Sequence, residues 1–459
     1  MTQSPALDYG IANSERFLRE LEALTCIPSI STDPAYDQDI KRAAEWLKDR
    51  MEVAGLQSVE VAPTAGHPVV YGEWKGAGAG APTVLLYAHY DVQPAELTDG
   101  WKTEPFKPTR KDGKIYARGV GDDKLHSVMI IQLAESFIKS GEMSPVNLKL
   151  IIEGEEEKTS PNLAPWIREN RDRLSADYVL ICDGGIKSPD RPTIVYGLRG
   201  ALGMEFTVHG PSTDLHSGLF GGCVHNPAQV IAEMVAKLHH PDGRVAVPGF
   251  YDEVKEMSAE ERHQLNMNPV TAEELHSGTG IPDTWGEPGY TLLERSVARP
   301  TLEINGIYGG FTGEGMKTVI PATASAKITC RLVNDQVPST IAQLIESYLN
   351  EIKPSTVTLK VKHQGEGDPV TVPIDSPLVQ ALDRSMEMTW GFKPEYRRMG
   401  GSVPVAPVFQ NELGVPTLLL GFNVDNGGFH GPNEFIHMEL FHKGLKTMVH
   451  LLRDLGDCS

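Results

Sequence analysis

The sequence predicts an α/β fold, in which a largely parallel sheet flanked by helices forms one domain and a smaller α+β domain is inserted into it. Two observations predict the first domain: short runs alternate with helical stretches along the chain, and most of the runs are apolar throughout, as in strands buried on both faces. A third observation predicts the insertion. The runs after Gly200 alternate apolar and polar residues, which is typical of strands with one wet face.

Two amphipathic helices are expected first along the chain. Their apolar residues recur with the i, i+3, i+4, i+7 spacing of one buried helix face. These residues are Phe17, Leu18, Leu21 and Leu24 in the first helix and Ile40, Ala43, Ala44, Leu47 and Met51 in the second. Gly55 follows the second helix and is expected to end it, because glycine readily takes the left-handed conformation of a C-cap.

Four apolar runs are expected as strands of the parallel sheet. They are 83–88 (TVLLYA), 148–152 (LKLII), 178–181 (YVLI) and 417–420 (TLLL), and a strongly apolar helix is expected over 125–138, between the first two. Apolar strands that alternate with helices indicate a buried, largely parallel sheet.

The inserted domain is expected to combine alternating strands with helices. The strands are expected at 204–209, 326–333 and 357–363, and the helices near 226–238 and 339–352. The segment 241–300 is rich in Pro, Gly and charge, and no element is assigned to it. We therefore expect an outer, discontinuous domain of residues 1–199 and 378–459 and an inserted domain of residues 200–377.

Composition narrows the class of protein. The 459 residues carry 42 Lys and Arg against 61 Asp and Glu, for a net charge of −19, which argues against a nucleic-acid partner. The five cysteines are scattered, odd in number and without CxxC spacing, so reduced thiols are expected. The N-terminus lacks the basic and apolar parts of a signal peptide, and no apolar run reaches 18 residues. A cytoplasmic protein without a membrane partner is expected.

A polar or acidic cluster follows each of the four predicted strands. The clusters are His89-Tyr90-Asp91, Glu153-Gly154-Glu155-Glu156-Glu157, Cys182-Asp183-Gly184-Gly185, and Asp425 with His430 beyond it. The carboxyl ends of parallel strands meet at one edge of a sheet, which is where ligands bind in open α/β folds. Four clusters of imidazole and carboxylate at equivalent positions therefore predict a metal site at this edge.

Each cluster alone has a simpler interpretation. His89 could be a hydrogen-bonded histidine at a strand end, Asp122 and Asp123 could cap the following helix, and 155–157 could be a solvated acidic face. The glycines at 119 and 121 do not complete a dinucleotide-binding GxGxxG motif, because position 124 is Lys. Directly after a buried strand, however, three adjacent glutamates need a counter-charge, and a metal supplies it. One glutamate would then bind metal while its neighbour acts as a free general base.

The ordered set of motifs resembles the di-zinc metallopeptidase family of carnosine dipeptidases, carboxypeptidase G and aminoacylase. The motifs are His89-Tyr90-Asp91, Gly121-Asp122-Asp123-Lys124, Glu156-Glu157, Asp183, Asp214-Leu215-His216-Ser217-Gly218 and His430-Gly431-Pro432-Asn433-Glu434. The segments 309–321 (GGFTGEGMKTVIP) and 400–404 (GGSVP) are similar to the dipeptidase branch. The resemblance covers nearly the whole chain, and the ordered set is far more specific than any one motif.

The resemblance implies a role for each residue of the catalytic domain. Two zinc ions per subunit are implied, although Mn or Co would suit the same ligands. One ion would be held by His89 and Asp183, the other by Glu157 and His430, and Asp122 would bridge them. Glu156 would be the general base, and Asp91 would orient the ring of His89.

The resemblance also assigns the inserted domain as a lid that mediates homodimerisation. His216 would stabilise the oxyanion from the partner subunit, and Thr318, Arg331 and Ser402 would bind the backbone and carboxylate of the substrate. Some positions depart from the family pattern and concern the substrate pocket: Leu125 replaces a usual Gly, Thr159 and Ser160 follow Lys158 where Gly-Ser is usual, and Met399 precedes GGS. A second Leu-His-Ser-Gly at 275–278 is interpreted as coincidence.

The function expected from these residues is metal-dependent hydrolysis of a peptide bond in dipeptides or small peptides. Two ions about 3.5–4 Å apart would lower the pKa of a shared water toward about 7, and Glu156 would accept its proton. Deacylation of N-acyl amino acids on the same site is the alternative. A catalytically inactive binding protein on this scaffold is disfavoured, because neither the base nor any ligand is missing.

Overall fold

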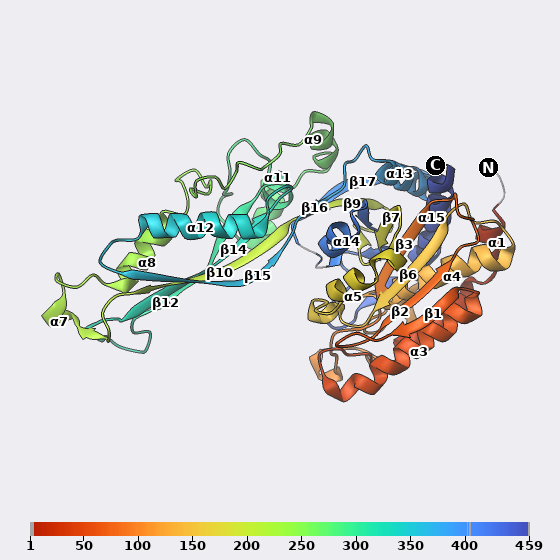
Figure 1. Cartoon of the computed structure of the whole chain (residues 1–459), viewed down its shortest axis with the longest axis horizontal. Coiled ribbons are helices and arrows are strands. Elements are labelled where there is room, and N and C mark those ends of the chain that lie inside the picture. The colour runs from red at the N-terminus through yellow and green to blue at the C-terminus, as the bar shows by residue number, and fades with distance from the viewer. Residues whose placement is uncertain (1–3, 402, 404, 458–459) are drawn as a thin grey trace. The chain divides into compact units, whose positions relative to one another are not determined.

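The computed structural model describes residues 4–401, 403 and 405–457 and divides the chain into two compact units (Figure 1). Unit 1 comprises Met1–Tyr196, Val372–Arg397 and Pro404–Ser459, and unit 2 comprises Gly197–Thr371 and Arg398–Val403. The division therefore falls a few residues from the domain limits expected at 199/200 and 377/378, and the roles expected for the two domains stay predictions.

Unit 1 is built on a six-stranded sheet in the order β1-β2-β6-β3-β7-β18. Its strands are β1 (Gln57–Ala62), β2 (Val69–Trp74), β3 (Thr83–His89), β6 (Asn147–Glu153), β7 (Tyr178–Ile181) and β18 (Thr417–Leu419). β6, β3, β7 and β18 are parallel, whereas β1 and β2 add an antiparallel edge. The α/β class and the four predicted buried strands are confirmed.

Helices cover both faces of this sheet (Figure 1). α3 (Asp37–Ala54) and α4 (Lys124–Ser140) pack on one face, and α5 (Leu163–Glu169) and α14 (Val405–Leu413) lie on the other. α4 is buried over 124–137 because it is enclosed by the sheet and by further helices, which explains its apolar sequence. α3 ends at Gly55 in the left-handed conformation (φ 101°), as predicted.

The remaining elements of unit 1 are further helices, 3₁₀ turns and short strands. The helices are α1 (Pro5–Ala12), α2 (Ser14–Thr25), α6 (Arg171–Leu174), α13 (Pro377–Trp390) and α15 (Met438–Asp457), with 3₁₀ turns η1 (Pro34–Tyr36), η2 (Leu97–Asp99) and η3 (Glu156–Lys158). The strands are β4 (Thr109–Lys111), β5 (Lys114–Tyr116) and β20 (Phe435–His437) in one small sheet, and β8 (Gly185–Ile186) and β19 (Asn423–Val424) in another. The backbone hydrogen bonds of these small sheets fix loops that follow the main strands.

Unit 2 is built on a four-stranded antiparallel sheet in the order β12-β14-β10-β15. Its strands are β10 (Gly200–His209), β12 (Thr301–Gly309), β14 (Thr323–Leu332) and β15 (Thr358–Gly367), and α8 (Pro227–Ala236) and α12 (Pro338–Ile352) pack against them. Buried and half-buried residues alternate along β10, which confirms the predicted strand with one wet face. Smaller elements are β11 (Leu215–His216), β13 (Val319–Ile320) and α7 (Ser217–Phe220). Strands β9 (Thr193–Leu198), β16 (Val370–Thr371) and β17 (Glu395–Met399) form a further three-stranded sheet.

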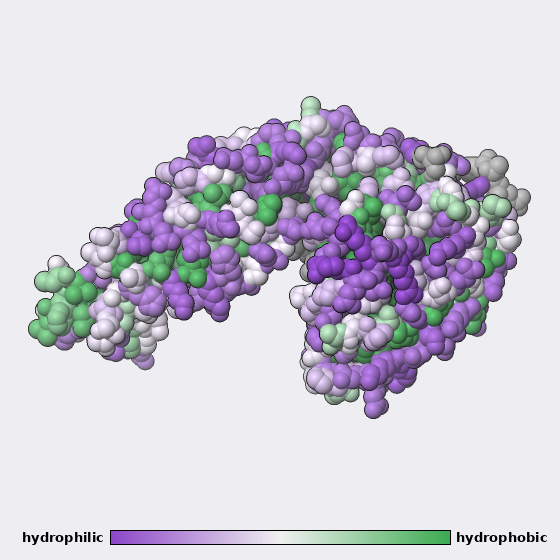
Figure 2. Space-filling model, viewed as in Figure 1, coloured by the Kyte–Doolittle hydropathy of each residue, from purple (hydrophilic) through white to green (hydrophobic). Residues whose placement is uncertain are grey.

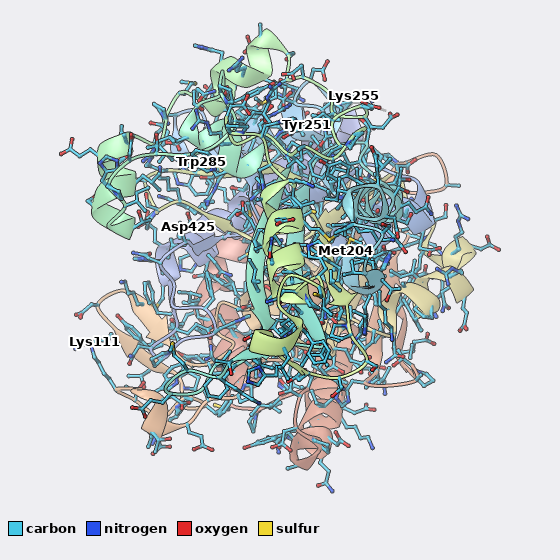
Figure 3. All side chains as sticks on the ribbon, turned by 90° about the vertical axis from the view of Figure 1, so that its left-hand side faces the viewer. Lys111, Met204, Tyr251, Lys255, Trp285 and Asp425 are labelled. Carbon is cyan, nitrogen blue, oxygen red and sulfur yellow. The ribbon has the colours of Figure 1, made fainter. Side chains whose placement is uncertain are left out.

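The segment 241–300, which the sequence left without elements, forms α9 (Ala259–Leu265), α10 (Ala272–Thr279) and α11 (Leu292–Val297). Figure 3 labels Tyr251, Lys255 and Trp285 in this segment. Polar contacts organise it: Arg299 forms a two-pronged ion pair with Glu287, and its guanidinium lies over the ring of Tyr290. Such contacts leave no periodic apolar pattern, which is why the sequence did not reveal these helices. Among the described residues, no helix is both long and apolar enough to cross a membrane.

Candidate active site

Three strands of the main sheet of unit 1 end beside one another and deliver the predicted residues. His89 is the last residue of β3, Asp183 follows β7, and Glu156 and Glu157 begin the η3 turn after β6. β3 lies between β6 and β7 and is parallel to both, so the three carboxyl ends share one edge. The acidic run after the strand forms a 3₁₀ turn.

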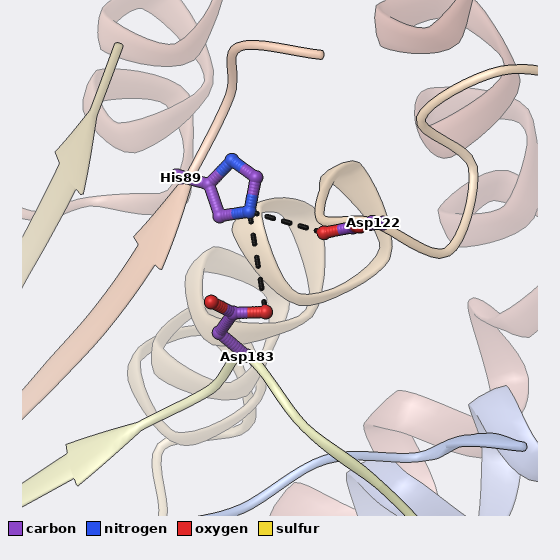
Figure 4. Close-up of side chains that lie close together, drawn as sticks. All are labelled: His89, Asp122 and Asp183. Atoms are coloured by element: carbon purple, nitrogen blue, oxygen red, sulfur yellow. Dashed lines mark hydrogen bonds and ion pairs between the residues drawn. The ribbon is translucent and has the colours of Figure 1, made fainter. Parts of the chain in front are cut away.

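The first group of possible ligands is His89, Asp122 and Asp183 (Figure 4). Nε2 of His89 lies 3.2 Å from Oδ1 of Asp122 and 4.0 Å from Oδ1 of Asp183. His89 is fully buried.

The second group is Asp122, Glu157 and His430. Nε2 of His430 lies 3.1 Å from Oδ2 of Asp122 and 3.3 Å from Oε2 of Glu157. Asp122 therefore turns one carboxylate oxygen toward each histidine. This is the arrangement that a carboxylate shared by two ions requires.

The electrostatics of these groups fit a divalent metal. Burial, reinforced by neighbouring carboxylates, raises the pKa of Asp183 and of Glu157 to about 7 and that of Glu156 to about 9. Burial also opposes ionisation of Asp122, but hydrogen bonds from the two histidines hold its pKa below its usual range. In each group the ligand atoms lie within 4.8 Å of one another. Imidazole nitrogen and carboxylate oxygen are ligands that Zn²⁺ and similar ions accept, and a cation relieves the crowding of negative charge.

Asp91 organises both the histidine and the glutamate pair. Its Oδ1 lies 3.3 Å from Nδ1 of His89, and its main-chain oxygen lies 3.1 Å from the same nitrogen. Its carboxylate also accepts hydrogen bonds from the backbone N–H groups of Glu156 (3.1 Å) and Glu157 (3.0 Å). Within the part of the chain that the structure describes, the Glu156 carboxylate has no hydrogen-bond partner. A bound cation would lower its raised pKa and leave it ionised and free to accept a proton.

Two acidic residues near the site have other contacts. Asp425 is exposed and pairs with Arg397 at 2.7 Å, so of the fourth cluster only His430 joins the ligand groups. Asp123 occupies the N-cap position of α4 without making a capping hydrogen bond from its side chain. Its carboxylate instead accepts a hydrogen bond from the backbone N–H of His89 (3.1 Å) and contacts Nδ1 of His126.

The residues predicted to bind substrate belong to unit 2. His216 and Thr318 are exposed neighbours there, because β11 pairs with β13 and the backbone N–H of Ser217 donates to the carbonyl of Thr318 (3.1 Å). His216 is the N-cap of α7, and its Nδ1 accepts a hydrogen bond from the N–H of Gly218 (3.0 Å). Arg331 is half-buried on β14. Ser402 lies outside the described residues. The roles assigned to these four residues stay predictions.

Sequence reasoning missed two side chains that touch the ligand groups. Gln93 donates a hydrogen bond to Oε2 of Glu157 at 2.6 Å. Its position could have suggested this contact, because it continues the alternation of His89 and Asp91. Glu434 accepts a hydrogen bond from the backbone N–H of Asp122 at 3.1 Å. It was seen within the His430 motif, but no role was given to it.

Two of the departures from the family pattern, Leu125 and Thr159, lie in well-defined local surroundings. Leu125 is 1% exposed and packs in the hydrophobic core of unit 1, away from solvent. Thr159 closes the η3 turn with a φ of 67°, in the left-handed region that favours glycine. The backbone at this position would favour glycine, and the chain has Thr159 instead.

Comparison with known proteins defines the class. The model of peptidase family M20/M25/M40 matches residues 85–454, and the chain belongs to this family. It is a metallopeptidase, an enzyme that hydrolyses peptide bonds with the help of a divalent metal.

Individual relatives match almost the whole chain. The Cys-Gly metallodipeptidase dug1 of Schizosaccharomyces pombe is 32% identical over 467 residues, which cover 97% of this chain and 96% of that protein. The Beta-Ala-His dipeptidase of Homo sapiens is 30% identical, over 95% of this chain and 89% of its own. Among solved structures, the M20 family metallo-carboxypeptidase Sso-CP2 from Sulfolobus solfataricus has a TM-score of 0.79 at 31% identity, over 96% of this chain and 99% of that one.

Proposed function

We propose that this protein is a dipeptidase with two divalent metal ions per subunit, zinc fitting the ligands best. One observation carries the proposal: the two oxygens of Asp122 face two separate histidine and carboxylate groups. His89 and Asp183 would hold one ion, Glu157 and His430 the other, and Asp122 would bridge them. The names of the relatives support dipeptides as the substrate class.

The ions, when bound, supply Lewis acidity: they polarise the scissile carbonyl and lower the pKa of a nearby water. Glu156 accepts the proton of the attacking water on its free carboxylate. The same carboxyl group then returns the proton to the nitrogen of the leaving amine, so Glu156 ends the cycle ionised. The carboxylate of Asp91 keeps Glu156 in place by accepting a hydrogen bond from the backbone N–H of Glu156.

Two other substrate classes fit the same chemistry. The structural similarity to Sso-CP2, named a metallo-carboxypeptidase, favours release of a C-terminal residue as the second candidate. Arg331 would bind the terminal carboxylate in either case, because a guanidinium donates two parallel hydrogen bonds to a carboxylate. Hydrolysis of N-acyl amino acids needs no subsite for a free α-amine and is the third candidate.

We further propose a homodimer in which His216 completes the active site of the partner subunit. An apolar region of unit 2 supports self-association: Leu219 and Phe220 of α7 are 74% and 40% exposed, and Met316 is 98% exposed. Figure 2 shows hydrophobic residues on the part of unit 2 that carries α7. The described cysteines are Cys26, Cys182, Cys223 and Cys330, and they form no disulfide, which agrees with the proposed cytoplasmic location.

A substitution of the base tests the mechanism. Glu156→Gln should retain both metals and lose turnover by at least about 10²–10⁴-fold, because an amide cannot accept the proton. Metal content is counted by elemental analysis and turnover is measured on the same preparation. Near-normal turnover with unchanged metal content would show that Glu156 is not the base.

A substrate screen separates the three candidates. The metal-loaded protein is incubated with free dipeptides, with the same dipeptides blocked at the N-terminus, and with N-acyl amino acids. A dipeptidase should favour the free dipeptides, a carboxypeptidase the blocked ones, and a deacylase the N-acyl amino acids. Preference for a blocked substrate would contradict the dipeptidase proposal while leaving the metal assignment intact.

A further inference from the structure

Glu434 is a buried carboxylate that accepts hydrogen bonds from the loop leading to Asp122. It is fully buried and lies directly before β20. Its Oε1 accepts hydrogen bonds from the backbone N–H groups of Gly121 (2.9 Å) and Asp122 (3.1 Å). Its Oε2 accepts from the N–H of Gly119 (2.9 Å). One side chain therefore holds three backbone groups of the segment that ends in the proposed bridging ligand.

Arg118 connects the same carboxylate to the loop of His430. Its Nη1 donates to Oε2 of Glu434 at 2.7 Å, and its Nη2 donates to the carbonyl of Gly431 at 3.1 Å. Arg118 is 2% exposed, so this ion pair is shielded from water. Gly431 is the residue after His430, which itself has a left-handed backbone (φ 57°). The pair therefore links two segments more than three hundred residues apart in the sequence.

Both linked segments supply ligands to the same proposed ion. Asp122 and His430 belong to the second group, together with Glu157, whereas the first group receives only Asp122 from these segments. Loosening Glu434 would displace two of the three ligands of the second group but one of the three ligands of the first.

We propose that Glu434, held by Arg118, is a positioning residue that sets the affinity of the second metal site, the one formed by Asp122, Glu157 and His430. It touches no substrate and acts through the two ligands that it aligns. This inference rests on the proposed function in one respect, namely that metal binds at these two groups. A carboxylate at this place is chemically suited to the task because its four lone pairs accept three backbone donors and an arginine at once.

Unit 2 offers a matched control. Glu294 is also fully buried and also accepts four hydrogen bonds, from Arg262 twice, from Asn266 and from the backbone N–H of Thr291. Glu294→Gln makes the same chemical change at another fully buried carboxylate that is paired with an arginine, in a part of the chain that holds no ligand of either group. A general cost of losing a buried carboxylate would appear in both variants.

The experiment compares wild type, Glu434→Gln and Glu294→Gln. Each metal-free protein is titrated with Co²⁺ by calorimetry, the visible spectrum of the bound ion is followed in parallel, and the melting temperature is measured without metal. We expect Glu434→Gln to bind one Co²⁺ with nearly wild-type affinity and a second about 10–100-fold more weakly, as for residues that orient metal ligands. We expect Glu294→Gln to bind both ions like wild type. Saturating Co²⁺ should restore turnover of Glu434→Gln, because the substitution leaves the base and the ligands in the chain.

Arg118→Lys serves if Glu434→Gln does not fold. A lysine keeps the positive charge but lacks the fork that joins Glu434 to Gly431, so the second ion should again bind more weakly. The proposal would be overturned if Glu434→Gln or Arg118→Lys bound the second ion with wild-type affinity. It would also be overturned if Glu294→Gln lost as much affinity for that ion. If wild type binds fewer than two ions, the proposed two-ion function is wrong. In that case the single ion must bind more weakly to Glu434→Gln than to Glu294→Gln. Equal affinities would show that the positioning role is wrong as well.

Discussion

At the scale of single residues, Asp122 and Glu153 show how burial makes a carboxyl group depend on its surroundings. Asp122 has a histidine within about 3 Å of each oxygen, and these contacts favour its ionised form. Glu153 is 2% exposed and is the last residue of β6, and its Oε1 accepts hydrogen bonds from the hydroxyls of Tyr87 and Ser160. Burial raises the pKa of Glu153 to about 8.

Removing the shared ligand should cost metal and activity together. Asp122→Ala deletes the oxygens that face both histidines and leaves Asp183 and Glu157 without the bridging partner. We expect fewer than two metals per chain after dialysis and no measurable turnover, because the ligand proposed to be common to both ions is lost. Elemental analysis that finds two tightly held ions in this variant would show that Asp122 is not the bridge.

Glu153 should make the metal-free protein less stable as pH rises. Its carboxyl group ionises near its ordinary value of 4.5 in the unfolded chain but only at about 8 in the folded one. The free energy of unfolding therefore falls between about pH 4.5 and 8, by at most roughly 3–5 kcal/mol from this group. Glu153→Gln mimics the protonated acid and has no proton to lose.

The stability difference between Glu153→Gln and wild type should therefore grow from pH 5 to pH 8.5 in favour of the variant. Urea unfolding of both proteins in excess chelator at the two pH values measures it. A difference that does not change with pH would show that Glu153 ionises in the folded protein as it does in the unfolded chain.

At the scale of elements, the η3 turn combines the proposed base, a proposed metal ligand and a strained residue. Glu156 and Glu157 begin the turn, and Thr159 ends it with φ 67° and ψ 30°. A β-branched residue in the left-handed region costs about 1–2 kcal/mol relative to glycine, which has no Cβ to clash. The turn is therefore less stable than it would be with glycine at position 159.

Thr159→Gly should stabilise the protein. We expect the free energy of unfolding to rise by about 0.5–1 kcal/mol, because relief of strain exceeds the extra chain entropy of glycine in the unfolded state. Chemical denaturation measures the change. Thr98→Gly is the matched control, since Thr98 is exposed in the 3₁₀ turn η2, outside the left-handed region, and should lose stability. Equal losses in both variants would show that the backbone at Thr159 carries no strain.

At the scale of the whole molecule, the proposed catalytic residues are divided between two units. All the proposed ligands and the proposed base lie in unit 1, whereas His216 lies in unit 2 at the N-cap of α7. If His216 acts on the partner subunit, a monomer is inactive even with both metals bound. An imidazole that stabilises the oxyanion would contribute about 10²–10³-fold to kcat.

Mixing two inactive variants tests action across the dimer. One variant carries His216→Ala and the other Glu156→Gln. In the heterodimer, one site combines an intact Glu156 with an intact His216 from the other chain, so activity should return toward half of wild type per heterodimer. His216→Asn repeats the test with a residue that can still cap α7. Subunit exchange proven by native mass without any return of activity would show that His216 acts within its own chain or not at all.

The sequence by itself determined the class of fold and predicted the residues that the structure brings together in the two groups of possible ligands. Buried parallel strands must be apolar throughout, so β3, β6, β7 and β18 are visible as runs, and chain direction alone brings their carboxyl ends to one edge. His89, Asp183 and Glu157 could therefore be expected together. His430 was expected at this edge only in the cluster beyond Asp425, and its role as a ligand, like that of Asp122, came from its place in an ordered set of motifs, because neither residue directly follows a strand of the main sheet.

Only the tertiary structure decided which further contacts the polar residues make. Asp425 comes after β18 as predicted but pairs with Arg397. Asp91, expected to orient the ring of His89, also accepts hydrogen bonds from the backbone N–H groups of both glutamates. Glu434 holds its loop through backbone N–H groups. Every residue but proline offers such a donor, so these contacts leave no trace in the residue types of the loop. The physical reason is that local pattern follows from burial along one element, whereas these hydrogen bonds depend on which distant loops meet in space.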